Sequence, residues 1–302
     1  MTSRQQSIAS MISVVAEGRC ALLATYQIFQ FIVGYAMAQA FAVNLMYTHG
    51  LQMGNYQFLI QDLFYITILA ALMGYTKPRK ELARAKPVSR VLSLPLVLSL
   101  LLQIAVIIVF QLIALGAMHR IPWYKPTIGT PDLRTYKAPE TTVIYLINLS
   151  QFVILGVVFN KGYPHRQPLW TNVGMVVAMI LQVAFLVYSL FSVDAFTTKV
   201  QTMVGRDPPD GLPTAFRAGL LVIMVVHAAV SLLAELGSTH GLRLIEKAKS
   251  SGWLQRRRST TDPVLRQGLL HPMHIGVPLP KHSPANGLHV PSLQPPSGAA
   301  LL

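Results

Sequence analysis

The chain has 302 residues, of which 52% are hydrophobic and only 12% are charged, and its mean hydropathy is +0.47. About a quarter of the residues of a soluble domain are charged, so this composition excludes a water-soluble enzyme. The single cysteine, Cys20, excludes a disulfide framework and any cysteine-based zinc or iron–sulfur site. A net charge of +14 on so apolar a chain indicates a membrane protein with basic cytosolic loops, and no nucleic acid is needed to explain it.

Six segments of the chain are long and apolar enough to cross a bilayer, whose core of about 30 Å takes roughly 20 helical residues. No alternating strand pattern competes with them, so the predicted fold class is an all-α membrane protein with six transmembrane helices. The predicted domains are a cytosolic stalk entry over residues 1–20, a transmembrane domain over 21–236 and a tail over 237–302. The predicted spans are Ala21–Tyr47, Tyr56–Tyr75, Val91–Met118, Thr142–Phe159, Asn172–Phe191 and Phe216–Leu236.

The tail over residues 237–302 is basic and rich in proline, serine, histidine and glycine, which predicts disorder. Its first part, residues 242–254, has two interpretations, a short amphipathic helix on the membrane surface or a solvated basic segment, and we favour the second. The tail histidines lack the regular spacing of metal ligands. We therefore expect neither a metal ion nor another cofactor in this chain.

The orientation follows from the loop between the second and third predicted spans, which carries six basic residues against Glu81 between positions 76 and 90. Positively charged loops stay on the cytosolic side of a membrane. With this loop inside, the cytosolic segments hold 18 basic and 4 acidic residues, and the opposite loops hold 6 and 5. The sequence therefore predicts that both termini are cytosolic.

One carboxylate, Asp62, lies deep in a predicted span, about a third of the way into the second one. A charged aspartate at the centre of a span costs roughly 2.5 to 3.5 kcal/mol, and such residues face a bundle interior, a partner or a water-filled path. Asp62 is therefore the leading candidate for a binding residue. The alternative is that Asp62 is protonated, or hydrogen-bonded to Gln57 or Gln61, and serves only helix packing.

The first predicted span adds Tyr35 and Gln39, which are four residues apart and so share a helix face. A carboxylate could neutralise an ammonium, a tyrosine ring could hold a methylene stem and an amide could orient it, so the three residues would suit an extended organic cation. Tyrosine and glutamine are also common packing residues, and this second interpretation is equally supported.

Three small residues, Gly34, Ala38 and Ala42, form a stripe beside Tyr35 and Gln39. Such a stripe favours a closely packed partner helix, and no other span is an obvious mate for it. We therefore predict a partner helix from outside these six spans. The remaining polar residues of the spans are interpreted as cross-links between helices and are assigned no chemistry: Asn44, Gln103, Gln111, Asn148, Gln151, Gln182 and His227.

Several strings of residues resemble the C-terminal membrane region of type V P-type ATPases, and most closely the polyamine-transporting branch, type 5B. Residues 17–19 (Glu-Gly-Arg) before the first span, and Gly54, residues 57–59 (Gln-Phe-Leu) and 62–63 (Asp-Leu) at the start of the second, resemble the family's fifth and sixth transmembrane helices. The string from Lys161 to Asn172 is similar to the loop between its eighth and ninth helices. The resemblance covers about three quarters of the chain, from Glu17 to Leu236, and equates the six spans with helices five to ten.

The resemblance implies a pump of the lysosome or late endosome that exports polyamines to the cytosol, driven by ATP and Mg²⁺ in large cytosolic domains. Carried over residue by residue, the family's substrate-binding tyrosine and glutamine fall on Tyr35 and Gln39, and its sixth-helix aspartate falls on Asp62. Gln57 also matches a family position, although we interpret it as a packing residue at a helix end.

This sequence departs from the family because it holds no phosphorylation motif and no nucleotide-binding domain, so the chain alone is expected not to hydrolyse ATP. The first hypothesis is that it is a fragment, the C-terminal transport half of a polyamine pump that needs the missing N-terminal half. The second is a non-catalytic membrane protein that binds or regulates a full-length pump through Gly34, Ala38 and Ala42. The third is a passive six-helix channel or carrier with Asp62 in its pore.

Overall fold

The structure, a computed structural model, describes residues 9–79, 93–122, 124–127, 136–207 and 211–238. The predicted tail, with the segment 242–254, and most of the basic loop between the second and third spans lie outside the described residues. Within the described part the chain is helical and forms no β-strand. An isolated antiparallel bridge joins Pro78 to Arg166.

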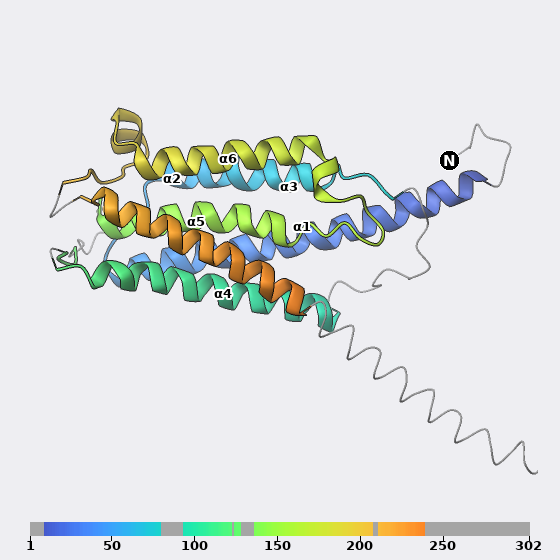
Figure 1. Ribbon diagram of the computed structural model, residues 1–302, viewed down its shortest axis with the longest axis horizontal. Helices are drawn as coiled ribbons and strands as arrows, with labels where there is room; N and C mark the ends of the chain where they lie inside the picture. Colours follow the sequence, from blue (N-terminus) through green and yellow to red (C-terminus); the bar gives the residue numbers. More distant parts are fainter. Residues whose placement is uncertain (1–8, 80–92, 123, 128–135, 208–210, 239–302) are drawn as a thin grey trace, which may run out of the picture. The chain divides into compact units, whose positions relative to one another are not determined.

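All six predicted spans are helices that are long and apolar enough to cross a membrane, which confirms the predicted fold class. The second span is a continuous succession of three helical segments, α2, η1 and α3, and the sixth is the last helix, drawn in orange in Figure 1. Two short helices, η2 and η3, lie in the connections. The bounds are α1 Ala9–Thr48, α2 Asn55–Leu59, η1 Ile60–Thr67, α3 Ile68–Met73, α4 Leu94–His119, α5 Pro139–Val158, η2 Leu169–Thr171, α6 Val173–Phe191, η3 Phe196–Val200 and Thr214–Ser238 for the last helix.

Helix α5 is the central helix of the bundle. In its most apolar stretch 89% of the residues are buried, against 28–33% in each of the other five spans. It packs against α1, α4, α6 and the second span, and Figure 1 shows it running between them. Because α5 is covered on every side, its polar side chains, Asn148 and Gln151 among them, are buried and need partners on the neighbouring helices.

The polar residues of α5 are joined to its neighbours by side-chain amides. The amide nitrogen of Gln111 on α4 lies 2.9 Å from Asn148 Oδ1, 2.8 Å from Gln151 Oε1 and 3.1 Å from the carbonyl oxygen of Ala38 on α1. The amide of Gln151 donates in turn to the carbonyl of Ile107 at 3.1 Å. Hydrogen bonds between buried amides hold transmembrane helices together, so the predicted cross-linking role of these residues is confirmed.

The stripe of small residues on α1 has a different partner from the one predicted. Gly34, Ala38 and Ala42 are buried within the chain itself, and a β-carbon added at Gly34 would lie only 3.2 Å from side-chain atoms of Leu155 and Phe159. The prediction that an outside helix packs on this stripe was therefore wrong. The close approach that small residues allow is used by the central helix α5 and by Phe159, the residue directly after it.

A buried arginine joins three segments at the end of the bundle where α1 begins. Arg166, only 1% exposed, donates to the side-chain oxygen of Gln27 and, at 2.5 Å, to the carbonyl of Met73. Burial lowers the pKa of its guanidinium below the usual value. The backbone N–H of Arg79 donates to the carbonyl of His165 at 3.1 Å, so the two connections on this side are held together.

A second buried arginine lies at the opposite end of the bundle. Arg217, 1% exposed, donates to the carbonyl oxygens of Leu190 (2.7 Å), Val204 (2.9 Å), Gly205 (3.0 Å) and Leu212 (2.9 Å). Four carbonyls from the end of α6 and from the following connection thus share one planar guanidinium, whose five donors form a rigid fork. No sequence pattern indicated this role for Arg217.

Candidate cation site

The predicted site residues come from two helices that pass side by side, α1 and the second span. Gln39 of α1 directs its amide nitrogen to Asp62 Oδ1 at 3.5 Å. Tyr35, one turn earlier on α1, is half-buried and packs its ring against Phe31 (5.6 Å between ring centroids) and Phe152 of α5 (6.4 Å). The structure therefore brings Gln39 and Asp62 together and positions Tyr35 on the same face of α1.

Asp62 lies in a π-helical stretch, η1, which the sequence pattern did not indicate. A π-helix shifts the backbone hydrogen bonds by one residue and leaves carbonyls in need of other donors. The hydroxyl of Thr67 donates to the carbonyl of Asp62 at 2.7 Å, and the amide of Gln182 on α6 donates to the carbonyls of Phe64 (2.7 Å) and Tyr65 (3.3 Å). π-Helical segments occur frequently at functional sites.

The packing alternative named two glutamines as partners of Asp62, and both are engaged elsewhere. Gln57 accepts from the N–H of Gly54 at 3.1 Å and donates to the carbonyl of Gln201 at 2.7 Å, and so caps the start of α2. Gln61 is buried and directs its amide to the sulfur of Met53 at 3.9 Å. Neither side chain bonds Asp62.

The carboxylate of Asp62 is exposed on the outer surface of the described bundle. Among the described residues one salt bridge forms, between Lys161 and Glu235, so Asp62 has no cationic side chain as a partner within this part of the chain. An exposed aspartate in a span faces a cost of roughly 2.5 to 3.5 kcal/mol near the bilayer centre. A bound cation, a proton or a polar neighbour at this position offsets that cost.

A groove of about 450 Å³ runs along α1 next to Gln39. It is open on one side, and its lining combines two aromatic rings, small aliphatic side chains and two amides, which suits a chain of methylene groups with polar ends. Its lining residues are Tyr35, Ala36, Gln39, Ala40, Val43, Asn44 and Phe58. Asn44, which we predicted to cross-link helices, donates instead to the carbonyl of Ala40 on its own helix at 2.9 Å, so this prediction was wrong.

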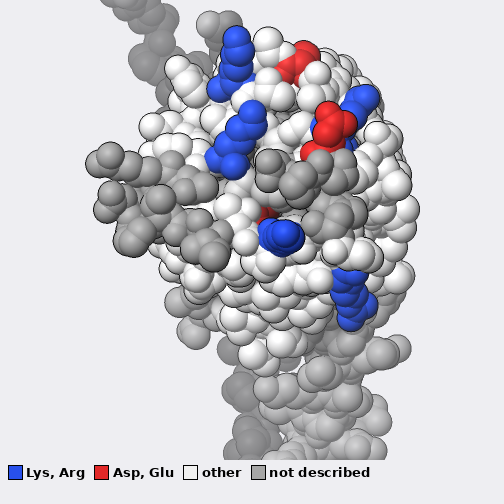
Figure 2. Space-filling view, turned by 90° about the vertical axis from the view of Figure 1, so that its left-hand side faces the viewer, with Lys and Arg blue, Asp and Glu red and all other residues white. Residues whose placement is uncertain are grey.

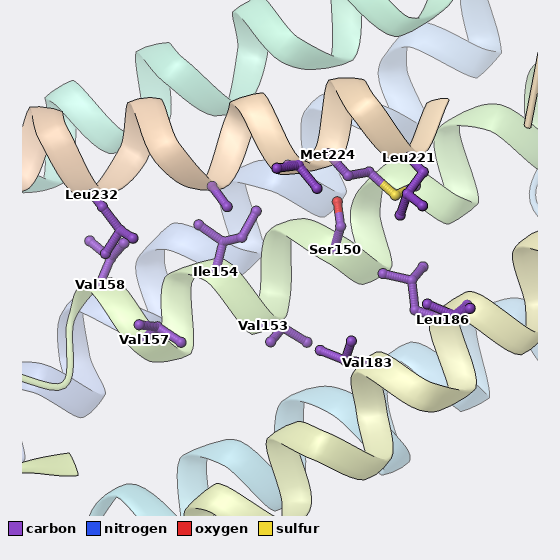
Figure 3. A pocket seen from close by; sticks show the side chains of 13 residues that line it. Ser150, Val153, Ile154, Val157, Val158, Val183, Leu186, Leu221, Met224 and Leu232 are labelled. Carbon is purple, nitrogen blue, oxygen red and sulfur yellow. The ribbon is translucent and has the colours of Figure 1, made fainter. Parts of the chain in front are cut away.

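A second hollow, of about 290 Å³, lies between α5, α6 and the last helix, and Figure 3 shows its lining. Valine, leucine, isoleucine and methionine side chains point into it, and Ser150 is the polar side chain among them. The hydroxyl of Ser150 already donates to the carbonyl of Ile147 at 2.7 Å. This apolar lining has no group that could stabilise a cation, so the groove beside Gln39 is the better candidate.

Sequence reasoning also missed a buried carboxylate at the start of α5. Glu140 accepts from the hydroxyl of Tyr124 and, at 2.8 Å, from the backbone N–H of Thr127. Burial and this hydrogen bond to Glu140 raise the pKa of Tyr124. Glu140 lies in the first turn of its helix, where a negative charge is stabilised by the helix dipole, so it fixes the preceding connection to α5. The sequence did contain a signal for this role, because Glu140 directly follows Pro139, and a proline often begins a helix.

The end of the bundle where α4 finishes and α5 begins is the face shown in Figure 2. Lysine and arginine side chains lie there interspersed with acidic ones. Within the described residues no three His, Cys, Asp or Glu side chains gather as they would around a metal ion. The charged groups of this end therefore form a mixed surface without the single sign that a basic cytosolic face carries.

The chain is similar over most of its length to ATPases that transport polyamines or other cations. It is 38% identical over 184 residues to polyamine-transporting ATPase 13A2 of Mus musculus, covering 60% of this chain and 16% of that protein. It is 28% identical over 265 residues to a probable cation-transporting ATPase 13A4 of Gallus gallus (78% and 21%), and 23% identical over 261 residues to a vacuolar cation-transporting ATPase of Saccharomyces cerevisiae (86% and 16%). No family model matches the chain.

These comparisons confirm the resemblance that the residue strings indicated, because the relatives are polyamine- and cation-transporting ATPases. The chain spans roughly a sixth to a fifth of the length of the curated relatives it matches. The similarity therefore concerns a part of those proteins, a part that in this chain consists of membrane helices.

Proposed function

We propose that this chain forms the C-terminal membrane portion of a polyamine-transporting pump and supplies part of its substrate site, with Asp62 as the anionic group. The observation that carries the proposal is an exposed carboxylate in a π-helical turn of a span, within 3.5 Å of the Gln39 amide. A polyamine has ammonium groups joined by methylene stems. Asp62 would neutralise one ammonium, Gln39 would orient it, and Tyr35 would hold the adjoining stem along the groove.

The energy for transport would come from ATP hydrolysis in the longer proteins to which the chain is similar, and their names support this division of roles. We further propose that both termini are cytosolic and that the protein resides in a late endosomal or lysosomal membrane. The vacuolar name of the yeast relative supports an acidic organelle. The mixed charge of the face in Figure 2 supports a lumenal position for that end.

The test is equilibrium binding of radiolabelled spermine to the full chain in nanodiscs of neutral phosphatidylcholine, because anionic lipids would themselves bind the polycation. Asp62→Asn keeps the shape of the side chain and removes its charge. A hydrogen-bonded ion pair contributes about 1.5 to 3 kcal/mol, so the dissociation constant should rise about ten-fold or more. Tyr35→Ala and Gln39→Ala should weaken binding less.

Asp207→Asn is the matched control, because this exposed aspartate lies away from the groove and its removal changes the net charge equally. The thermal midpoint of each variant is recorded in the same nanodiscs. If Asp62→Asn lowers the midpoint and leaves the spermine concentration dependence unchanged, the packing interpretation is correct and the site assignment is wrong. If the chain without substitutions shows no saturable spermine binding, the proposal is also overturned.

A further inference from the structure

A row of buried polar side chains, which we term the polar seam, lies between α4 and the last helix. The last helix contributes His227, Ser231 and Glu235, which are spaced by four residues and therefore share one face. Helix α4 contributes Ser99 and Gln103 at the same spacing. All five are between 94% and 100% buried. None of them belongs to the candidate cation site.

One end of the polar seam carries an ion pair. Glu235 forms a salt bridge with Lys161, which is itself 37% exposed, and accepts from the hydroxyl of Ser99 at 2.7 Å. One turn further in, the amide of Gln103 donates to the backbone carbonyl of Ser231 at 2.9 Å. The predicted cross-linking role of Gln103 is thereby confirmed, and the seam opens to solvent at the Lys161 end.

Deeper in the seam, four polar atoms have no hydrogen-bond partner: both ring nitrogens of His227, the hydroxyl of Ser231 and the side-chain oxygen of Gln103. The ring of His227 contacts Phe110, at 4.6 Å between centroids, which offers no conventional acceptor or donor, so the prediction that His227 cross-links helices by hydrogen bonds was wrong. Buried polar atoms in native proteins are almost always bonded, and where protein groups are missing a water takes their place. Four such atoms within two turns indicate bound water.

The position of His227 shows how far the polar seam extends into the membrane. His227 lies eight residues from Glu235, about 12 Å along the helix axis, and close to the middle of the span Thr214–Ser238. Beyond it, towards Thr214, Leu220 on the last helix and Ala114 on α4 are buried and apolar. The polar path therefore reaches mid-membrane from the Lys161 end and stops there.

We propose that the polar seam is hydrated and that His227 is a proton-binding site in the middle of the membrane, reached from the end that carries Lys161 and Glu235. Chains of acidic and histidine side chains inside membranes mark proton paths. Helix α4 faces His227 with Phe110, and α5 faces the last helix with Ser150 and aliphatic side chains. Glu235 and Lys161 are thus the charged groups of the seam among the described residues.

The first test measures access of an aqueous ion to the seam. The chain has one cysteine, so Cys20→Ser gives a background in which Ser231→Cys is the single thiol. Ag⁺ added to proteoliposomes binds a thiolate and blocks its later alkylation in denaturant. A hydrated seam should make Ser231→Cys react about ten-fold faster than a thiol surrounded by hydrocarbon, because the thiolate forms poorly in apolar surroundings.

The matched controls are Val230→Cys and Leu233→Cys, which lie at nearly the same depth on the same helix and have exposed side chains. Blocking of Ser231→Cys that is faster than both, and that comes from the Lys161 side, supports the proposal. A rate equal to those of the two controls means that the seam is dry and overturns it. Serine and cysteine are similar in size, so the substitution should leave the packing unchanged.

The second test observes the proton itself. In nanodiscs the chain labelled with ¹⁵N-histidine gives ring resonances for nine histidines, and the resonance lost in His227→Gln or His227→Phe identifies the site. The proposal predicts that this resonance changes from the neutral to the protonated form as the bulk pH falls from about 8 to about 3.5, a range that includes and extends below the values at which histidine ordinarily titrates. A ring that remains neutral over this whole range overturns the proposal.

Discussion

Tyr65 and Gln182 bond each other in both directions across the interface between the second span and α6. The hydroxyl of Tyr65 donates to the backbone carbonyl of Gln182 at 2.8 Å, and the amide of Gln182 donates to the carbonyl of Tyr65 at 3.3 Å. The same amide also satisfies the carbonyl of Phe64 at 2.7 Å. This exchange fixes the π-helical stretch in which Asp62 lies, because it supplies donors that a π-helix lacks within itself.

Gln182→Leu should therefore destabilise the bundle and disturb the site, although residue 182 touches no part of the groove. Leaving the carbonyls of Phe64 and Tyr65 unbonded costs about 1 to 3 kcal/mol. We expect a lower thermal midpoint and weaker spermine binding in the same variant. Both are measured with the chain in nanodiscs, alongside Tyr65→Phe.

Val183→Ala, one residue along α6 with its side chain exposed, serves as the control and should change spermine binding little. A double variant, Gln182→Leu with Tyr65→Phe, gives the coupling between the two side chains. If the losses of stability in the two single variants simply add up to the loss in the double variant, the two reciprocal hydrogen bonds act independently.

The six spans could be predicted because length and hydropathy decide whether a segment crosses a membrane, and neither depends on tertiary contacts. The packing partners of these spans could not be predicted from the sequence. The stripe of Gly34, Ala38 and Ala42 indicates that a helix packs closely on α1, but the sequence does not identify that helix. In the structure the partner is α5 of the same chain. Pairing is decided by the fit of all six helices together.

The candidate site was predictable in part for a similar reason. Asp62 was recognisable from the cost of a carboxylate in a span, and Tyr35 and Gln39 from their spacing and from the family resemblance. The π-helix was not predictable, because it depends on donors that arrive from α6 and from Thr67. Arg217 escaped notice because its partners are backbone carbonyls, which carry no signal in the sequence.

Arg217→Lys should lower stability even though it keeps the charge. The guanidinium reaches four carbonyls with a planar fork, whereas an ammonium is a single point of three donors and can reach fewer of them. Hydrogen bonds from a charged donor contribute about 1.5 to 3 kcal/mol, so a loss of about 3 kcal/mol is expected. Chemical unfolding in detergent measures it. Arg206→Lys, at an exposed arginine with one carbonyl partner, should cost far less, and equal losses in the two variants would contradict the structural role of Arg217.

The stability of the loop after α5 should depend on pH through His165. Burial, and then the nearby Arg19, hold the pKa of His165 below its usual value of about 6.5. The unfolded chain therefore takes up this proton first, so the stability that His165 contributes is complete above about pH 6.5 and is lost as the pH falls through the folded-state value. The thermal midpoint should decline from pH 7 to about 5, and His165→Gln should flatten this decline. His119→Gln, at an exposed histidine, should leave the slope unchanged, and a slope that survives in His165→Gln would assign the effect to another group.

The predicted topology can be tested through two exposed residues at opposite ends of the bundle. Tyr163 is exposed and lies in the loop between α5 and α6. This loop is bonded to the start of the basic loop, because the backbone N–H of Gln167 donates to the carbonyl of Lys77 at 3.0 Å. Lys199 lies in η3 on the other side of the bundle. The bonded loops must share one side of the membrane, and the excess of basic residues places that side in the cytosol.

In the Cys20→Ser background, a membrane-impermeant maleimide is applied to sealed vesicles of known orientation that carry either Tyr163→Cys or Lys199→Cys. We expect Tyr163→Cys to react from the cytosolic side and Lys199→Cys from the lumenal side. Reversal of both results would invert the topology, and the polar seam would then open to the lumen, since Lys161 lies only two residues from Tyr163. Because α6 is the one span between the two thiols, labelling of both from the same side would instead mean that α6 does not cross the membrane.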